Sequence, residues 1–246
     1  MDYSLSALLS DELAQYQITA ADEQLRGILR HLEMVAEWNE HLNLTAITDD
    51  REMIVKHAVD SALVLLVTEL APGLKVLDVG TGAGFPGVTL KCLMPGVDLT
   101  LLETLAKKCK FLEAVKADLF AGAQGAGADC SIVWGRAEEK GQEKGYREQF
   151  DLVVARAVAQ LRVLAEYTLP FCRVGGTVVA LKGPAAEAEV ADAADAIKIL
   201  GGRLEEVRSV ELPLGAGSRT LIRMKKVAAT PAKYPRKAGT PLKSPL

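Results

Sequence analysis

Apolar residues between positions 75 and 225 form short runs separated by longer amphipathic stretches, a pattern typical of alternating strands and helices. The predicted strands are 75–79, 97–102, 131–134, 150–155 and 176–181, with a closing pair at about 204–212 and 220–225. The predicted helices are at about 86–94, 105–121, 160–169 and 185–200, with a glycine–alanine loop over 122–128. Such units form an α/β sheet of seven strands, mostly parallel with a reversed last strand, and with helices on both faces.

The first 72 residues have a helical pattern and predict a lobe placed before the sheet. Thr19 and Asp22 form a possible capping box, and the apolar residues after it share one helical face: Leu25, Ile28, Leu29, Leu32 and Val35. A second cap at Asp49 and Glu52 predicts a helix over about 51–70.

Polar residues on this second helix lie on or beside its buried face. His57 and Ser61 share the face with Ile54 and Ala58, and Asp60 is one position off it. A histidine on an apolar face is usually a satisfied core residue, so the helix alone favours a structural role for His57 and leaves a functional role open.

A glycine-rich loop follows the first predicted strand, and the rest of the sheet is organised around it. Gly80, Gly82 and Gly84 alternate, and Pro86 suits the first turn of a helix. Strand, glycine loop and helix in this order form the ligand-binding corner of a doubly wound sheet.

The ligand of this corner is indicated by two acids. Gly82, Gly84 and Gly87 satisfy the dinucleotide pattern G-x-G-x-x-G, which is weak evidence alone. Asp78 precedes the loop and would repel a pyrophosphate, but it suits an ammonium or sulfonium group. The stretch resembles motif I of S-adenosylmethionine-dependent methyltransferases, and we favour this interpretation over a nicotinamide site. Glu103, 23 residues after Gly80 at the end of the next strand, fits the ribose of either ligand.

Composition excludes several classes of protein. The net charge of −3 does not indicate a nucleic-acid partner. The sequence contains no run of 18 apolar residues, so it predicts no membrane span. The N-terminus has no signal-peptide pattern, and four cysteines without a C-x-x-C pair favour reduced thiols in the cytoplasm. The three histidines form no metal-ligand cluster, so we expect no metal.

Basic residues gather at the C-terminal end. From Arg219 onward there are eight Lys or Arg and no Asp or Glu, and several prolines interrupt regular structure. This pattern predicts either an extended cationic arm for RNA phosphates or a solvated tail, and the residues alone do not decide between them. The predicted division is therefore a helical lobe (1–72), a core (73–226) and a basic, proline-rich tail (227–246).

Several segments together resemble the small-subunit ribosomal RNA methyltransferase G family, also called RsmG or GidB. They are Trp38-Asn39, Asn43-Leu44-Thr45, His57 with Asp60-Ser61, the loop from Asp78 to Gly87, Gly135 to Glu139, Ala155-Arg156-Ala157, Lys182-Gly183 and Lys233 to Pro241. The resemblance implies a Rossmann-like class I methyltransferase fold. It also implies methyl transfer from S-adenosyl-L-methionine to N7 of a guanosine in the 530 loop of 16S rRNA.

The resemblance also assigns site residues. The expected cofactor-binding residues are Asp78, Gly80, Gly82, Gly84, Phe85, Glu103, Ala137, Glu138 and Arg156, of which Glu103 belongs by position rather than by motif. The expected orienting residues are His57, Asp60, Ser61 and Arg156. The expected RNA contacts are Lys233, Arg236, Lys237 and Lys243 in the tail. We expect a cytoplasmic monomer whose partner is 16S rRNA or the small ribosomal subunit.

The sequence lacks the motifs of other methyltransferase classes, and this agrees with the chemistry of N7 methylation. Guanine N7 has a lone pair and no proton, so the reaction needs positioning rather than a general base. No Asn-Pro-Pro-Tyr or Asp-Pro-Pro-Tyr motif and no cysteine come directly after the strand that ends at Arg156, and Cys172 lies past the next predicted helix. A non-catalytic RNA-binding or ribosome-assembly protein and a nicotinamide-dependent oxidoreductase are the alternatives, the latter weakened by the absence of a Tyr-x-x-x-Lys pair.

Overall fold

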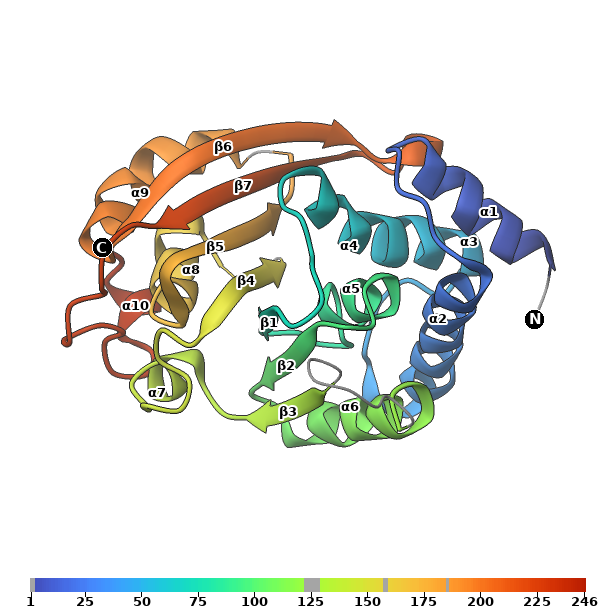
Figure 1. Cartoon of the computed structure of the whole chain (residues 1–246), viewed down its shortest axis with the longest axis horizontal. Coiled ribbons are helices and arrows are strands. Elements are labelled where there is room, and N and C mark those ends of the chain that lie inside the picture. Colours follow the sequence, from blue (N-terminus) through green and yellow to red (C-terminus); the bar gives the residue numbers. More distant parts are fainter. Residues whose placement is uncertain (1–2, 122–128, 157–158, 185) are drawn as a thin grey trace.

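Seven strands form one sheet in the computed structural model, which describes residues 3–121, 129–156, 159–184 and 186–246. They are β1 (Lys75–Val79), β2 (Asp98–Glu103), β3 (Cys130–Trp134), β4 (Phe150–Arg156), β5 (Cys172–Lys182), β6 (Gly202–Glu211) and β7 (Ser218–Lys226). Their order is β3-β2-β1-β4-β5-β7-β6 (Figure 1). The first five pair in parallel, and β7 is antiparallel to β5 and β6. The predicted sheet is confirmed, including its reversed last strand.

Helices cover both faces of the sheet (Figure 1). The N-terminal elements are α1 (Tyr3–Ala14), α2 (Asp22–Leu42), α3 (Asp50–Met53), the π-helix η1 (Ile54–Val59), α4 (Asp60–Ala62) and the 3₁₀-helix η2 (Leu63–Leu66). The later ones are α5 (Gly87–Leu93), α6 (Ala106–Leu119), α7 (Ala137–Lys140), α8 (Leu161–Thr168), α9 (Glu187–Ile199), the 3₁₀-helix η3 (Pro213–Gly215) and α10 (Thr240–Lys243). The loop predicted over 122–128, and Ala157 and Ala185, lie outside the described residues.

Two hydrophobic clusters lie on opposite faces of the sheet. Along β1 the side chains alternate, with Val76 in one cluster and Leu77 and Val79 in the other. The N-terminal helices share the first cluster with α5 and α6, whereas α8 and α9 pack in the second. The N-terminal helices are therefore part of the helical layer on one face of the sheet. No helix in the described part of the chain is long and apolar enough to cross a membrane.

The N-terminal helices differ in detail from the prediction. The Asp49 cap is confirmed, since its carboxylate accepts the Glu52 amide at 2.9 Å. Thr19 does not cap α2; instead Gln24 Oε1 accepts the amide of Ala21 at 2.7 Å. The helix predicted over 51–70 is wrong as one continuous α-helix, because it contains the π-turn η1 and ends at Leu66 as a 3₁₀-helix.

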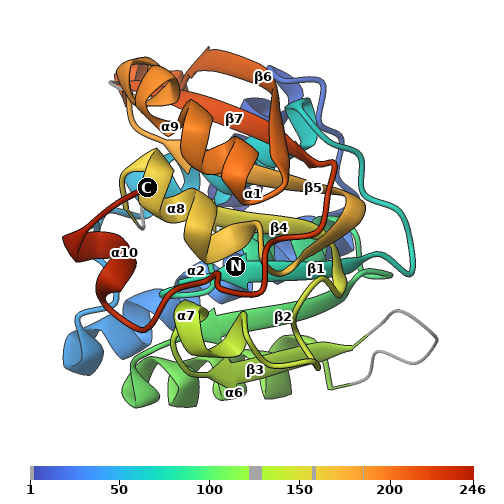
Figure 2. The ribbon, with the colours of Figure 1, turned by 90° about the vertical axis from the view of Figure 1, so that its left-hand side faces the viewer.

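The C-terminal tail is docked on the protein, which corrects the prediction of an extended arm without regular structure. It passes α7 and α8 and contains the short helix α10 (Figure 2). Tyr234 is buried in the second cluster, and Arg147 donates to the carbonyls of Thr230 and Tyr234, both at 2.7 Å. These contacts are long-range in sequence, so local composition did not reveal them.

Arg236 anchors this tail on α8. Its guanidinium donates to both oxygens of the buried Glu166 carboxylate, with Nη2 to Oε2 at 2.6 Å, and its backbone amide donates to Oε1 at 2.7 Å. A fork-shaped guanidinium on a buried carboxylate is one of the stronger polar contacts in proteins.

We predict that Arg236→Ala lowers the free energy of unfolding by about 3 kcal/mol, because the Glu166 carboxylate is then left buried without its cation. Urea unfolding at pH 7 measures the change. Lys237→Ala is the matched control, since this exposed neighbour should change stability by less than about 0.5 kcal/mol. Equal stability of the two variants would contradict an anchoring role for Arg236.

Candidate active site

The glycine loop between β1 and α5 has a backbone that requires glycine. Gly80, Gly82 and Gly84 have φ angles of 70°, 62° and 93°, in the left-handed region that other residues rarely adopt. At Gly84 a Cβ would also lie 2.7 Å from Val88 Cγ2 and 3.0 Å from His31 Nε2. The loop is thus fixed by conformation and by close packing.

Two carboxylates brace the loop. Asp78 Oδ2 accepts hydrogen bonds from Thr81 Oγ1 at 2.7 Å and from the Gly87 amide at 2.9 Å. Glu103 Oε2 accepts the Gly82 amide at 3.0 Å, while its Oε1 accepts the Leu105 amide at 2.9 Å. Asp78 therefore joins the two ends of the loop, and Glu103 joins its middle to the start of α6.

Asp78 can also accept a further hydrogen bond. Its other oxygen, Oδ1, is buried and has no hydrogen-bond partner among the described residues. Burial raises the pKa of Asp78 to about 6, against the opposing effects of the Thr81 and Gly87 hydrogen bonds and of Arg156. A buried acceptor of this kind suits a ligand that brings a positive charge or an N–H group.

Phe85, at the end of the loop, lies between two histidines of the N-terminal segment. The centroid of its ring is 4.6 Å from that of His31 and 4.7 Å from that of His57. Burial lowers the pKa of His31 to about 4 and, with the charge of Arg156, that of His57 to about 3. Both imidazoles are therefore neutral near pH 7.

A buried ion-pair network connects the N-terminal segment to the sheet. The Asp60 carboxylate lies 3.1 Å from Arg156 Nη1 at the end of β4 and 3.0 Å from Arg219 Nε on β7. Arg156 also donates to the Lys56 carbonyl at 3.2 Å, and its guanidinium carbon lies 5.1 Å from the centroid of the Phe85 ring. Three segments distant in sequence are held together at the carboxyl edge of the sheet.

The π-turn η1 presents His57 to this network. Thr45 Oγ1 lies 2.9 Å from His57 Nε2, and Arg156 Nη2 lies 3.4 Å from Nδ1. Ser61 is fully buried and donates to the His57 carbonyl at 2.6 Å, so it supports the turn from inside. π-turns are rare and are frequent at functional sites.

Ala137 and Glu138 begin α7 at the neighbouring end of β3. Both are largely buried, and Glu138 Oε1 accepts the amide of Gly239 in the tail at 2.8 Å. The backbone connects this corner to β2, because the Gly135 amide donates to the Glu103 carbonyl at 3.0 Å. The predicted cofactor residues thus follow β1, β2, β3 and β4 along one edge of the sheet.

The four residues predicted to contact RNA differ in how exposed their side chains are. Lys233, Lys237 and Lys243 have exposed side chains. The Arg236 side chain is paired with Glu166 and is 23% exposed, so its contact with RNA stays a prediction.

His31 and Arg219 belong to the candidate site but were missed in the sequence. His31 Nε2 lies 2.8 Å from the Ala83 carbonyl in the glycine loop, and the side chain is fully buried. Its position three residues after Ile28 and four before Val35 places it on the apolar face of α2, a signal that could have found it. Arg219 carried no such signal, because only the reversed strand β7 brings it to this edge.

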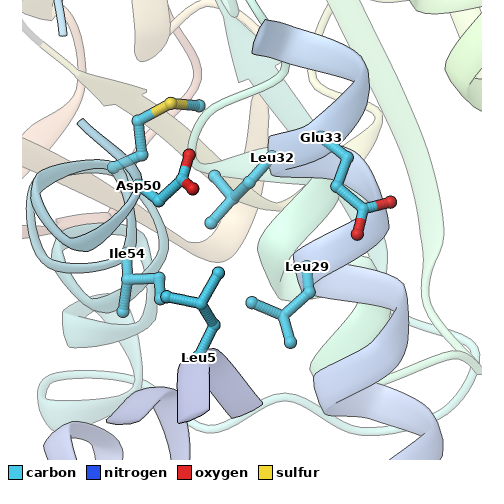
Figure 3. Close-up of a pocket in the computed structure, with 7 residues that line it drawn as sticks. Leu5, Leu29, Leu32, Glu33, Asp50 and Ile54 are labelled. Atoms are coloured by element: carbon cyan, nitrogen blue, oxygen red, sulfur yellow. The ribbon is translucent and has the colours of Figure 1, made fainter. Parts of the chain in front are cut away.

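A cavity of about 290 Å³ lies elsewhere, between α1, α2 and α3 (Figure 3). Leu5, Leu29, Leu32 and Ile54 give it an apolar lining, with Glu33 and Asp50 at its border. None of the residues discussed above at the carboxyl edge lines it.

The site offers orientation rather than acid–base or nucleophilic chemistry. Burial raises the pKa of Cys92 and Cys172 to about 12 and that of Cys130 to about 11, so these thiols stay protonated. Arg156 stays cationic, and no group of three or more His, Cys, Asp or Glu in the described ranges is placed to hold a metal ion.

The strand order and the braced glycine loop define the class of protein, a class I S-adenosylmethionine-dependent methyltransferase fold. Solved structures agree. A precorrin-6y C5,15-methyltransferase from Geobacter metallireducens aligns with a TM-score of 0.51 at 17% identity, covering 68% of this chain and 86% of that one. TrmN from Thermus thermophilus aligns with a TM-score of 0.50 at 17% identity, covering 69% and 49%.

Sequence relatives give the family. The family GidB, described as rRNA small subunit methyltransferase G, matches residues 24–222. Proteins named ribosomal RNA small subunit methyltransferase G are 54% identical over 239 residues in Symbiobacterium thermophilum, covering 97% of both chains, and 43% identical over 242 residues in Alkaliphilus oremlandii, covering 98% and 99%. The chain belongs to the rRNA small subunit methyltransferase G family, and the predicted resemblance is confirmed.

We predict that His31→Phe weakens binding of S-adenosylhomocysteine about tenfold, because the phenyl ring keeps the contact with Phe85 but loses the hydrogen bond that fixes the Ala83 carbonyl. Calorimetric titration measures the affinity at a temperature where both proteins are folded. His31→Gln should recover most of the affinity, and His41→Phe, at an exposed position, should retain it. If His31→Phe loses thermal stability but no affinity, the residue has only a packing role.

Proposed function

We propose that this protein transfers the methyl group of S-adenosyl-L-methionine to N7 of a guanosine in the 530 loop of 16S rRNA. The observation that carries the proposal is the glycine loop braced by Asp78 and Glu103, in a chain of this family. The target loop and the target atom are those that the family resemblance implies. We further infer that it acts in the cytoplasm as a monomer.

The residues at the carboxyl edge suit this cofactor. Glu103 Oε2 accepts a single hydrogen bond from the described residues, so it has a lone pair for a ribose hydroxyl. The glycines remove side chains that would otherwise occupy the space above the loop. Asp78 Oδ1 suits the ammonium group, and we expect Ala137 and Glu138 to line the adenine side, beyond Glu103. When bound, S-adenosylmethionine supplies a methyl group made electrophilic by the sulfonium.

The protein contributes to the reaction by positioning guanine N7 and the methyl group. Guanine N7 attacks with an in-plane lone pair and carries no proton, so no residue needs to act as a base. Holding nucleophile and electrophile in line can contribute about 7–11 kcal/mol to the lowering of the barrier. The groups available fit this demand, because the lowered pKa values of His57 and His31 make both imidazoles weak bases, and the Arg156 guanidinium cannot accept a proton.

The network around Asp60 supplies rigidity at the edge where the guanine would lie. Arg156 and Arg219 share one carboxylate, so the cluster carries a net positive charge close to the end of β4. Such a charge favours the approach of RNA phosphates and opposes displacement of η1 from the sheet.

The direct test uses small ribosomal subunits from a strain that lacks this methylation. With methyl-labelled S-adenosylmethionine, one 16S rRNA position should acquire the label, and chemical cleavage specific for N7-methylguanosine should map it to the 530 loop. Label at an adenine, at an exocyclic amine or at another loop would contradict the proposed target. Binding without transfer would favour the non-catalytic alternative.

We predict that the single-turnover rate of methyl transfer is nearly constant between about pH 7 and 9 and falls below about pH 6. Protonation of Asp78, whose pKa is about 6, removes the charge of the carboxylate that braces the loop. His57→Ala should slow the step by less than about tenfold, since it removes an orienting contact and no base. A rate that rises tenfold per pH unit through neutrality, and loses this dependence in His57→Ala, would instead identify His57 as a general base.

A further inference from the structure

The side chain of Trp134 is open to solvent at the end of β3, next to the candidate site. The residue is 66% exposed, and Nε1 donates to the Thr104 carbonyl at 2.9 Å, which fixes the orientation of the ring. Leu105, beside Thr104, is 46% exposed. An oriented and exposed aromatic ring beside an exposed leucine is an unusual surface for a chain in which aromatic residues make up 5%.

Four basic residues lie on the segments that adjoin this ring, at the start of α6 and directly after β3. Lys107 and Lys110 on α6 and Arg136 after β3 are exposed, and Lys108 is half-buried. No ion pair or side-chain hydrogen bond of these four residues occurs within the described ranges. Lys108 Nζ lies 3.9 Å from the position of a Cβ on Gly82, so the cationic surface reaches the glycine loop.

We propose that this surface binds a single-stranded segment of the RNA substrate next to the target nucleotide. We name it the α6–β3 rim, and it comprises Leu105, Lys107, Lys108, Lys110, Trp134 and Arg136. The indole of Trp134 stacks on one base, and the four cations contact phosphates. Aromatic platforms beside cationic side chains are the usual means by which proteins hold single strands. This inference rests on the proposed function.

RNA fits the rim better than the adenine of the cofactor does. Glu103, Ala137 and Glu138, which are expected to hold the cofactor, are 5%, 9% and 6% exposed. A small-molecule site encloses most of its ligand, whereas the indole of Trp134 lies largely outside such an enclosure. The four cations, which have no side-chain partner among the described residues, match a polyanion, in a chain whose net charge is −3.

The rim also provides cations that the C-terminal tail does not offer to RNA. Arg236 is committed to Glu166, so the tail provides fewer free cations than its sequence suggests. The rim is formed by the ends of β2 and β3 and the first turns of α6, all of which belong to the rigid sheet scaffold.

Filter binding of the unmethylated small subunit tests the proposal. Trp134→Ala should weaken binding about 10- to 100-fold, which corresponds to the loss of one stacked base, and Trp134→Phe should retain most of the affinity. The double variant Lys107→Ala with Lys110→Ala should reduce the slope of log affinity against log salt by about 1.4, from two lost phosphate contacts. Lys198→Ala, at an exposed position on α9, is the control and should change neither quantity.

Tryptophan fluorescence and cofactor titration test whether RNA contacts Trp134 itself. The chain has two tryptophans, so Trp38→Phe leaves Trp134 as the sole reporter, and RNA should quench its emission. Affinity for S-adenosylhomocysteine should be unchanged in Trp134→Ala. If Trp134→Ala binds the subunit as tightly as the unmodified protein, or loses cofactor affinity instead, the rim is not an RNA surface.

The outcome for the rim is separable from that for the proposed function. If the unmodified protein methylates the 530 loop and the Trp134→Ala variant binds the small subunit normally, only the proposal that the rim binds RNA is contradicted. If the unmodified protein methylates no 16S rRNA, the proposed function fails regardless of what Trp134→Ala does.

Discussion

The buried carboxylate of Asp78 is the constraint on which the site depends. It fixes both ends of the glycine loop through Thr81 and Gly87, and the loop then offers the Gly82 amide to Glu103 and places Phe85 between two histidines. Burial opposes the charge of Asp78, and its Oδ1 is left without a partner in the described protein. An arrangement that costs stability and leaves an acceptor unused is typical of a site prepared for a ligand.

The N-terminal helices contribute side chains to the candidate site. Asp60 pairs with Arg156 and Arg219, while His31 and His57 reach the loop from α2 and η1. Buried ion pairs of this kind contribute little net stability, but breaking one by removing a partner is costly. The network holds η1, β4 and β7 together, as the proposed in-line methyl transfer requires.

The sequence predicted the sheet because its apolar runs and glycine loop are local signals. Every predicted strand and helix of the core was found, and the loop at Gly80–Gly87 was correctly identified as the turn after β1. The contacts that were missed join residues far apart in the chain. Arg236 pairs with Glu166 across 70 residues, and Arg219 reaches Asp60 only because β7 is reversed. Neither composition nor periodicity contains that information.

An ionised Asp78 suits the proposed ligand but comes at a cost to the fold. With a pKa raised from 3.8 to about 6, the folded state retains a proton that the unfolded state loses between about pH 4 and 6, so stability falls as the pH rises through that range. Ionised Asp78 therefore costs on the order of 2–3 kcal/mol at neutral pH. The decisive measurement is calorimetric titration of S-adenosylhomocysteine into Asp78→Asn at pH 7.5, with folding verified by urea unfolding. We predict that Asp78→Asn is at least as stable as the original protein and binds the ligand at least tenfold more weakly; unchanged affinity would show that the Asp78 charge does not serve the ligand.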